Sequence, residues 1–353
     1  MGKQLNGLQA LRAFAAYAVV LYHVMRYFSV SNPLGLPLFA TGAAGVDIFF
    51  VISGFIMVYV TPNHETALSF IARRLARIVP LYWFATVLAV ILALARPWTF
   101  TNADISVESI LASFMFIPAE NLEGVLMPVL FVGWTLNFEM AFYVCFALSL
   151  LAPVRARPLL LSVMIVGGML AAMAFGNGVI TFYANTLVLE FLAGCAIAWF
   201  LLSETAKQIM PRVPVWPVAL LGIAGFALTS EGVGDGLGRH ILYGVPAALL
   251  VFAVASHDLY RKPFAKSLLQ ALGDRSYSAY LLHPIILSIL AVFVFEYLGT
   301  GILGVSVMLI GGVGLTLLVS DITYKFLELP ANKWLRACFG IAGPSTPVTA
   351  RPD

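Results

Sequence analysis

The chain alternates between long apolar stretches and short polar connections. Ten of the apolar stretches are long enough to cross the hydrocarbon core of a bilayer as helices. They lie at residues 8–28, 44–61, 79–96, 134–152, 159–175, 180–202, 216–230, 240–256, 277–297 and 302–326. This pattern predicts an all-α, polytopic integral membrane protein with about ten transmembrane helices. A further apolar stretch, 106–118, is only about a dozen residues long, so it is either a short span or an interfacial or re-entrant piece.

The composition supports a membrane protein. Hydrophobic residues make up 61% of the chain and charged residues only 10%, and the mean hydropathy is +0.95. Soluble domains carry about a quarter charged residues, which this chain lacks. The net charge of +3 gives no indication of a nucleic-acid partner. The cysteines and histidines show no metal-ligand spacing, so we expect no metal.

The distribution of Lys and Arg predicts the orientation. If 106–118 does not span, sixteen of these residues face the cytoplasm and only Arg26, Arg96 and Arg239 face outward. If it spans, the bias reverses to five against fourteen. The positive-inside rule favours the first arrangement, with both termini cytoplasmic. We expect one domain over residues 1–340 and a disordered tail over 341–353. The longest external connection, 97–133, is the best candidate for a lid or an acceptor-binding element.

Two polar residues share one face of the first helix. Arg12 and His23 are eleven residues apart, which returns nearly to the same azimuth after a rise of about 16 Å. Arg12 is expected near the cytoplasmic side and His23 toward the outer side. Ionisable groups at such depths usually mark function. The alternatives are snorkelling for Arg12 and a helix hydrogen bond for His23.

Two acidic residues are expected near the depth of His23. Asp47 begins the second helix, where a carboxylate could orient the His23 imidazole; its alternative is a first-turn acid favoured by the helix dipole. Glu139 enters from the outside in the fourth helix and needs a partner such as His23 or an acceptor hydroxyl; its alternative is a structural pairing. Ser53, beside Gly54, permits close packing or close approach of a ligand.

Further polar residues are expected on the cytoplasmic half. Arg73, Arg74 and Arg77 precede the third helix and suit a phosphate-rich ligand, although charges that set topology explain them in part. His283 precedes Pro284 in the ninth helix, so a kink is expected there, and His283 can hold a hydrogen bond that the kink frees. We count Ser53 and His283 with the arginines as candidate donor-binding residues.

Together these motifs resemble the membrane acyltransferase-3 family over the whole chain. Within it, the chain is most similar to exopolysaccharide-production (ExoZ-type) O-acetyltransferases. The resembling segments are Leu8–Arg12 with His23, G-V-D-I-F-F-V-I-S-G-F at 45–55, the Arg73/Arg74/Arg77/Pro80 loop, W-T-L-N-F-E at 134–139, E-F-L-A-G at 190–194, S-Y-S-A-Y-L-L-H-P at 276–284 and E-L-P at 328–330.

The resemblance implies transfer of an acetyl or other short acyl group from cytoplasmic acyl-CoA, such as acetyl-CoA, to a hydroxyl of an exported polysaccharide or its lipid-linked precursor. The family's arginine–ten residues–histidine signature falls on Arg12 and His23. The nucleotide would dock on Arg73, Arg74 and Arg77, and His23 would act as general base or form an acyl-histidine. A multi-pass protein of a bacterial inner membrane, surrounded by lipid and working beside polysaccharide-assembly proteins, is the expected setting.

Two other classes of protein fit part of the pattern. Buried His, Asp and Glu also suit a proton-coupled transporter. A flippase-like handler of a lipid-linked glycan would need the same polar interior without any chemistry. The arginine cluster at a cytoplasmic helix start favours the acyltransferase.

Overall fold

A computed structural model describes residues 5–28, 39–96, 102–229, 237–261 and 268–341. The expected tail therefore lies almost entirely outside the described residues. The longer helices are α1 Asn6–Arg26, α2 Gly45–Val60, α3 Ala67–Ala95, α5 Trp134–Ser149, α6 Arg157–Phe175, α8 Val188–Leu201, α10 Trp216–Ala227, α12 Val245–Tyr260, α14 Ser276–Tyr297, α15 Ile302–Thr323 and α16 Leu329–Cys338. The shorter elements are η1 Ala40–Ala44, α4 Val107–Phe114, β1 Ala119–Glu120, β2 Leu126–Met127, η3 Phe131–Gly133, α7 Val179–Phe182, α9 Glu204–Ile209, α11 Leu237–Arg239, η4 His240–Gly244, α13 Leu268–Asp274 and η5 Tyr324–Glu328.

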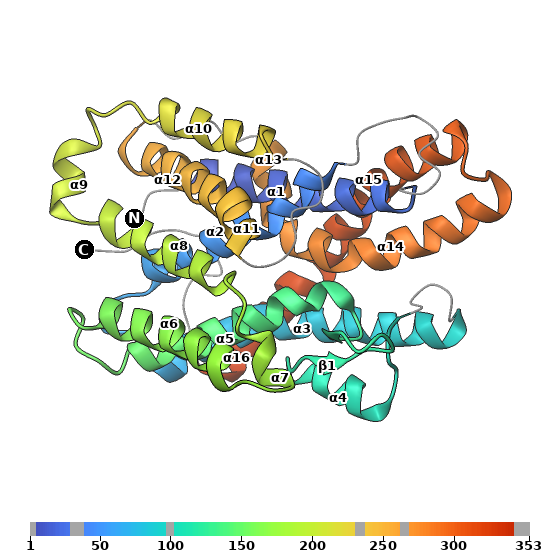
Figure 1. The fold of residues 1–353 in the computed structure, drawn as a ribbon, viewed down its shortest axis with the longest axis horizontal. Coiled ribbons are helices and arrows are strands. Elements are labelled where there is room, and N and C mark those ends of the chain that lie inside the picture. Colours follow the sequence, from blue (N-terminus) through green and yellow to red (C-terminus); the bar gives the residue numbers. More distant parts are fainter. Residues whose placement is uncertain (1–4, 29–38, 97–101, 230–236, 262–267, 342–353) are drawn as a thin grey trace.

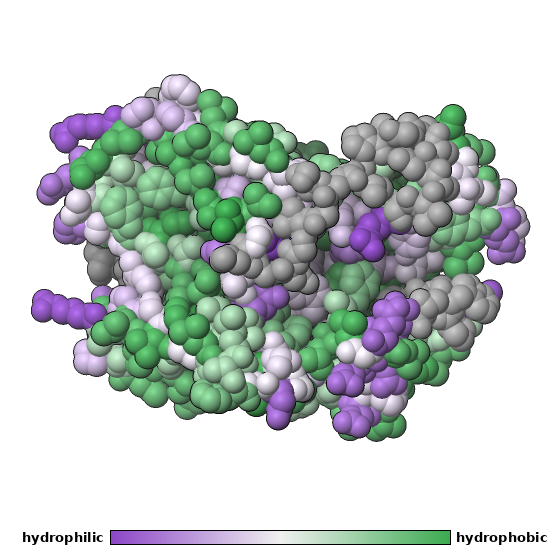
Figure 2. Space-filling model, viewed as in Figure 1, coloured by the Kyte–Doolittle hydropathy of each residue, from purple (hydrophilic) through white to green (hydrophobic). Residues whose placement is uncertain are grey.

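The described helices confirm an all-α, polytopic membrane protein. Within the described part of the chain, eight helical segments are long and apolar enough to cross a bilayer. Two more of the ten expected spans correspond to α8 and α10, which are apolar but only 14 and 12 residues long. Hydrophobic side chains cover most of the face in Figure 2, and hydrophilic ones gather toward its ends. This surface suits lipid around the middle of the molecule and water at its ends.

The stretch 106–118 does not span. It contains α4, whose eight residues rise only about 12 Å, and it leads into the antiparallel pair β1–β2. The indole Nε1–H of Trp83 on α3 donates to the carbonyl oxygen of Phe114 at 3.0 Å. The helix is thereby attached to the side of α3 and does not add a span to the ten expected ones.

Small residues bring α2 and α8 together. A Cβ on Gly54 would lie 2.0 Å from the carbonyl oxygen of Phe191, and a Cβ on Gly194 would lie 2.0 Å from that of Val51. Close approach of two backbones is the usual role of such glycines in membrane helices. The packing interpretation of Gly54 is therefore confirmed.

The short helix α13 sets the position of α14 along α1. α13 packs beside α1, where a Cβ on Gly273 would meet the Gln9 carbonyl oxygen at 2.0 Å. Because α13 occupies the first part of α1, α14 begins well along α1 and runs beside its C-terminal half (Figure 1). This offset decides which side chains of α1 and α14 meet.

Candidate active site

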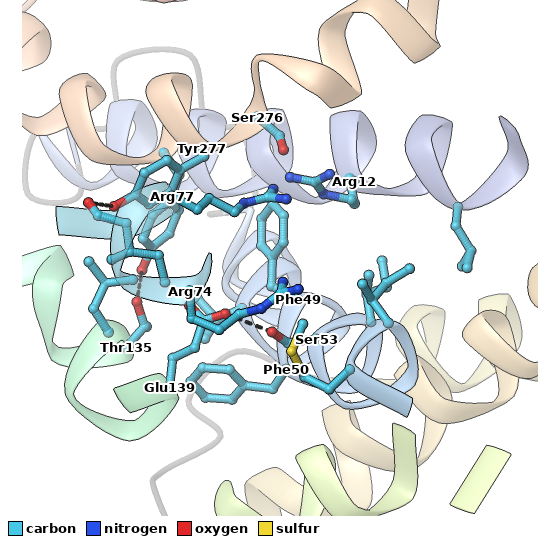
Figure 3. A pocket seen from close by; sticks show the side chains of 18 of the residues that line it. Arg12, Phe49, Phe50, Ser53, Arg74, Arg77, Thr135, Glu139, Ser276 and Tyr277 are labelled. Carbon is cyan, nitrogen blue, oxygen red and sulfur yellow. Dashed lines mark hydrogen bonds between the residues drawn. The ribbon is translucent and has the colours of Figure 1, made fainter. Parts of the chain in front are cut away.

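A cavity lies among α1, α2, α3, α5 and α14, with a volume of about 110 Å³. We call it the arginine cavity, because Arg12, Arg74 and Arg77 line it together with Glu139. Figure 3 shows these side chains entering from different helices, beside Ser53 of α2 and Tyr277 of α14. Pockets for drug-sized ligands span about 300–1,000 Å³, so only part of a large donor fits the cavity as it stands.

The charges lining this cavity are unbalanced. Three of the lining residues are arginines and one, Glu139, is a carboxylate, while Asp274 and Glu328 act on the charge of Arg12 from outside the lining. Arg74 stacks over the ring of Phe70, 5.5 Å from its centroid, and its buried Nε has no hydrogen-bond partner among the described residues. A buried guanidinium with an unused donor favours an anion that can accept bidentate hydrogen bonds, such as a phosphate.

A hydrogen-bonded chain positions Arg12. Its Nη1 donates to Gln9 Oε1 at 2.9 Å, and Gln9 Nε2 donates to Asp274 Oδ1 at 2.9 Å. Burial raises the pKa of the Asp274 carboxyl, and the nearby Arg12 charge opposes this shift. Sequence reasoning missed Gln9 and Asp274. Gln9 precedes Arg12 by three residues, a spacing at which two side chains on a helix are neighbours, so this spacing could have identified Gln9 as a partner of Arg12.

Glu139 lies in the arginine cavity rather than beside His23. It accepts a hydrogen bond from Ser53 Oγ at 2.7 Å and another from the hydroxyl of Tyr143, one turn along its own helix. The expected pairing of Glu139 with His23 is therefore wrong. A partly buried carboxylate is stabilised by hydrogen-bond donors and by positive charge, and the cavity supplies both.

The structure separates Arg73 from the other arginines of its cluster. Arg73 pairs with Glu65 and donates to Ser69 Oγ at 3.1 Å, whereas Arg74 and Arg77 line the cavity. Successive residues of a helix point about 100° apart, so neighbours in sequence need not reach the same cavity.

The histidine pair, His23 and His283, lies between α1 and α14. His283 Nε2 is 3.3 Å from His23 Nδ1, and the ring centroids are 4.9 Å apart. His283 was expected on the cytoplasmic half and His23 toward the outer side, but their contact shows that the two lie at the same depth, because α13 offsets α14 along α1. Phe131 packs on the other side of His23, with ring centroids 5.4 Å apart, and it belongs to the 97–133 connection.

A backbone carbonyl fixes the His23 tautomer. The carbonyl oxygen of Val19 lies 2.9 Å from His23 Nδ1. A carbonyl oxygen can only accept, so we assign the hydrogen to Nδ1 and the free lone pair to Nε2. When His23 is neutral, this hydrogen bond leaves the lone pair on Nε2, which can then take a proton.

Asp47 does not orient His23, contrary to the expectation. The Oδ2 atom of Asp47 accepts a hydrogen bond from Arg239 Nη2 at 2.7 Å. The buried Glu190 lies beside Asp47, and its Oε1 is 3.7 Å from His240 Nδ1. A carboxylate without exposure to solvent needs a positive partner, and Arg239, at the end of α11 just before η4, provides it. The orienting role that we expected of Asp47 belongs to the Val19 carbonyl.

Tyr280 links the arginine cavity to the histidine pair. Its ring lines the cavity and lies 5.9 Å from the His283 ring, centroid to centroid. Its hydroxyl lies 3.1 Å from Thr135 Oγ1 and 3.2 Å from the Val132 carbonyl oxygen. Tyr280 therefore lines the arginine cavity and also packs against His283 of the histidine pair.

Comparisons with known proteins show which family the chain belongs to. The model of the acyltransferase-3 family, described as an acyltransferase domain, matches residues 5–325. The chain is 40% identical to the exopolysaccharide production protein ExoZ of Rhizobium meliloti (strain 1021), over 72% of this chain and 79% of ExoZ. It is 28% identical to the O-acetyltransferase OatA of Staphylococcus aureus (strain NCTC 8325 / PS 47), over 94% of this chain and 58% of OatA.

No solved structure shows a significant match to the chain. The match to the family model covers most of the chain, and it includes the helices that line the arginine cavity and carry the histidine pair. The chain therefore belongs to the acyltransferase-3 family and is a multi-pass membrane acyltransferase.

Proposed function

We propose that the protein transfers an acetyl or other short acyl group from cytoplasmic acyl-CoA to a hydroxyl of an exported polysaccharide or of its lipid-linked precursor. The observation that carries this proposal is the arginine cavity, whose lining residue Tyr280 packs against His283 of the histidine pair. An anion site and a proton acceptor are the two parts that acyl transfer from a phosphate-bearing donor needs.

The donor's phosphates would bind to Arg74, Arg77 and Arg12. Arg74 contributes the unused Nε donor, and Arg12 is held in place by Gln9. The cavity accommodates only part of a CoA molecule, so we place phosphate and adjoining pantetheine atoms there and the thioester nearer His23. Arg12 and His23 are about 16 Å apart along α1, a distance that an extended pantetheine arm covers.

The chemistry would take place at His23. Nε2 removes the proton of the acceptor hydroxyl as its oxygen attacks the thioester carbonyl; the new C–O ester bond forms, the C–S bond breaks, and the proton passes to the leaving thiolate. In a two-step variant, Nε2 attacks the thioester carbonyl, the C–S bond breaks, and CoA leaves as the thiol with the proton lost from Nδ1. The acceptor hydroxyl then attacks the acyl-histidine, the N–C bond breaks, and the hydroxyl proton returns to the imidazole.

The names of the relatives support the acceptor class. ExoZ is named an exopolysaccharide production protein and OatA an O-acetyltransferase. On these grounds we propose an exported polysaccharide hydroxyl as acceptor and a bacterial inner membrane as location. The same grounds favour an enzyme over a transporter or a flippase-like protein.

The decisive experiment incubates the purified full chain in lipid nanodiscs with [¹⁴C]acetyl-CoA and oligosaccharides prepared from the host's exopolysaccharide. We expect alkali-labile label on the sugar and an equal amount of free CoA. Oligosaccharide that stays unlabelled, together with acetyl-CoA that stays intact, would contradict the proposal.

A further inference from the structure

A second cavity lies beyond the histidine pair, at the C-terminal ends of α1, α3 and α14. We call it the distal cavity; its volume is about 310 Å³, and the side chains that define it are Tyr27, Arg96, Ser288, Phe295 and Glu296. None of these residues belongs to the arginine cavity. Its size falls at the lower end of the range for small-molecule pockets.

Two contacts place this cavity one helical turn from the histidine pair. Tyr27 follows His23 by four residues, and Ser288 follows His283 by five. The hydroxyls of Tyr27 and Ser288 lie 3.2 Å apart, just as the two imidazoles are in contact below them. Four helical residues rise about 6 Å, so the distal cavity begins roughly 6 Å beyond the pair.

The two cavities therefore lie on opposite sides of the histidine pair. Arg12 precedes His23 along α1, and Tyr27 follows it. The same order holds on α14, where Tyr280 lines the arginine cavity and Ser288 lines the distal cavity. A donor in one cavity and an acceptor in the other would meet at His23.

The chemistry of the distal cavity differs from that of the arginine cavity. It carries one positive charge, Arg96, and one negative charge, Glu296. The rings of Tyr27 and Phe295 stand at 48° with centroids 6.2 Å apart, next to the Ser288 hydroxyl. Balanced charge disfavours a polyphosphate. Aromatic faces with a few polar groups suit a ring that has an apolar face and hydroxyl edges.

We propose that the distal cavity binds the acceptor, as a neutral sugar ring of the polysaccharide or of its lipid-linked precursor. The apolar face of the sugar packs on Tyr27 and Phe295, and its hydroxyls bond to Ser288, Arg96 and Glu296. One further hydroxyl then points toward His23. This inference rests on the proposed function, since it names the binding site of the acceptor in that reaction.

Steady-state kinetics of the full chain in nanodiscs test the assignment, with acetyl-CoA as donor. The acceptors are neutral oligosaccharides from the host's exopolysaccharide in one arm and the extracted lipid-linked precursor in the other. Glu296→Gln and Phe295→Ala should raise the KM for the acceptor by about tenfold or more, as for the loss of one strong contact, with the KM for acetyl-CoA unchanged. A rise with only one acceptor identifies that acceptor as the natural source.

Phe293→Ala is the matched control, because Phe293 is an exposed aromatic residue of α14 outside the distal cavity. We expect it to keep the wild-type acceptor KM. Both Phe295 and Glu296 are exposed, so folded protein is expected for all three variants. Wild-type acceptor KM values in Glu296→Gln and Phe295→Ala would overturn this inference and leave the proposed function intact. Absence of transfer by the wild-type protein would instead remove the proposed function.

Discussion

His283 lies in contact with His23 across the α1–α14 interface, its Nε2 3.3 Å from His23 Nδ1. The same Nδ1 is 2.9 Å from the Val19 carbonyl oxygen, so two acceptors share one N–H. These contacts fix both the tautomer and the orientation of the His23 ring. Nε2 is therefore presented in a constant direction, which is what a general base or an acyl-accepting nitrogen requires.

His23→Ala should abolish acyl transfer while the protein remains in the membrane. Loss of a positioned general base costs about 10²–10⁴ in rate, and loss of a nucleophile costs at least as much. The measurement is labelled acetyl transfer per mole of purified protein. His64→Ala is the control, since His64 is exposed in the α2–α3 connection and should keep full activity. Normal turnover by His23→Ala would remove His23 from the reaction.

His283→Ala should lower kcat and leave the KM for acetyl-CoA unchanged, because His283 contacts His23 and not the arginine cavity. The loss should vanish in a His23→Ala background, since residues that act as a unit are strongly non-additive. The comparison needs four proteins: the wild type, the two single variants and the double variant. An equal factor lost in both backgrounds would show that His283 only supports folding.

The arginines divide into two groups. Arg74→Ala and Arg77→Ala should each raise the KM for acetyl-CoA about tenfold or more, the usual cost of a lost hydrogen bond to a charged group. Arg73→Ala should leave that KM unchanged, because Arg73 pairs with Glu65 outside the cavity. Arg73→Ala is thus a matched control that removes an equal charge from the same helix. A similar rise in the KM for acetyl-CoA in all three variants would indicate that the positive charge of this helix attracts the donor in general, and that no phosphate binds specifically to Arg74 and Arg77.

The sequence predicted the helices well because long apolar stretches have few alternatives in a bilayer. It also predicted that Arg12 and His23 share a face, and both do face α14, through Ser276 in the arginine cavity and through His283. Both inferences need only the geometry of a single helix. Hydropathy overestimated the lengths of α8 and α10, which the structure limits to Val188–Leu201 and Trp216–Ala227.

Contacts between helices could not be predicted in the same way. Asp47 and Ser53 are six residues apart, so they point about 120° from each other and cannot both face the arginine cavity. We had expected Asp47 beside His23 only because both residues lie at a similar depth in their helices. The position of His283 depends on α13, a seven-residue helix whose effect on the register of α14 no apolar pattern reveals.

The Asp47–Arg239 pair provides a test of structural against catalytic roles. Arg239→Met leaves the buried Asp47 carboxylate next to Glu190 without its ion-pair partner, which costs about 3–5 kcal/mol when a buried pair is broken. We expect a large drop in abundance and in thermal unfolding temperature. Asp47→Asn combined with Arg239→Met should recover much of this loss, because both charges are then removed together.

The activity of the folded fraction distinguishes a structural role of Asp47 from a catalytic one. If Asp47 only balances Arg239, folded Asp47→Asn/Arg239→Met protein should retain a kcat close to that of the wild type. The Val19 carbonyl, which fixes His23 Nδ1, is untouched by either substitution. A kcat reduced to the level of His23→Ala in protein of normal thermal stability would restore Asp47 as a partner of the histidine.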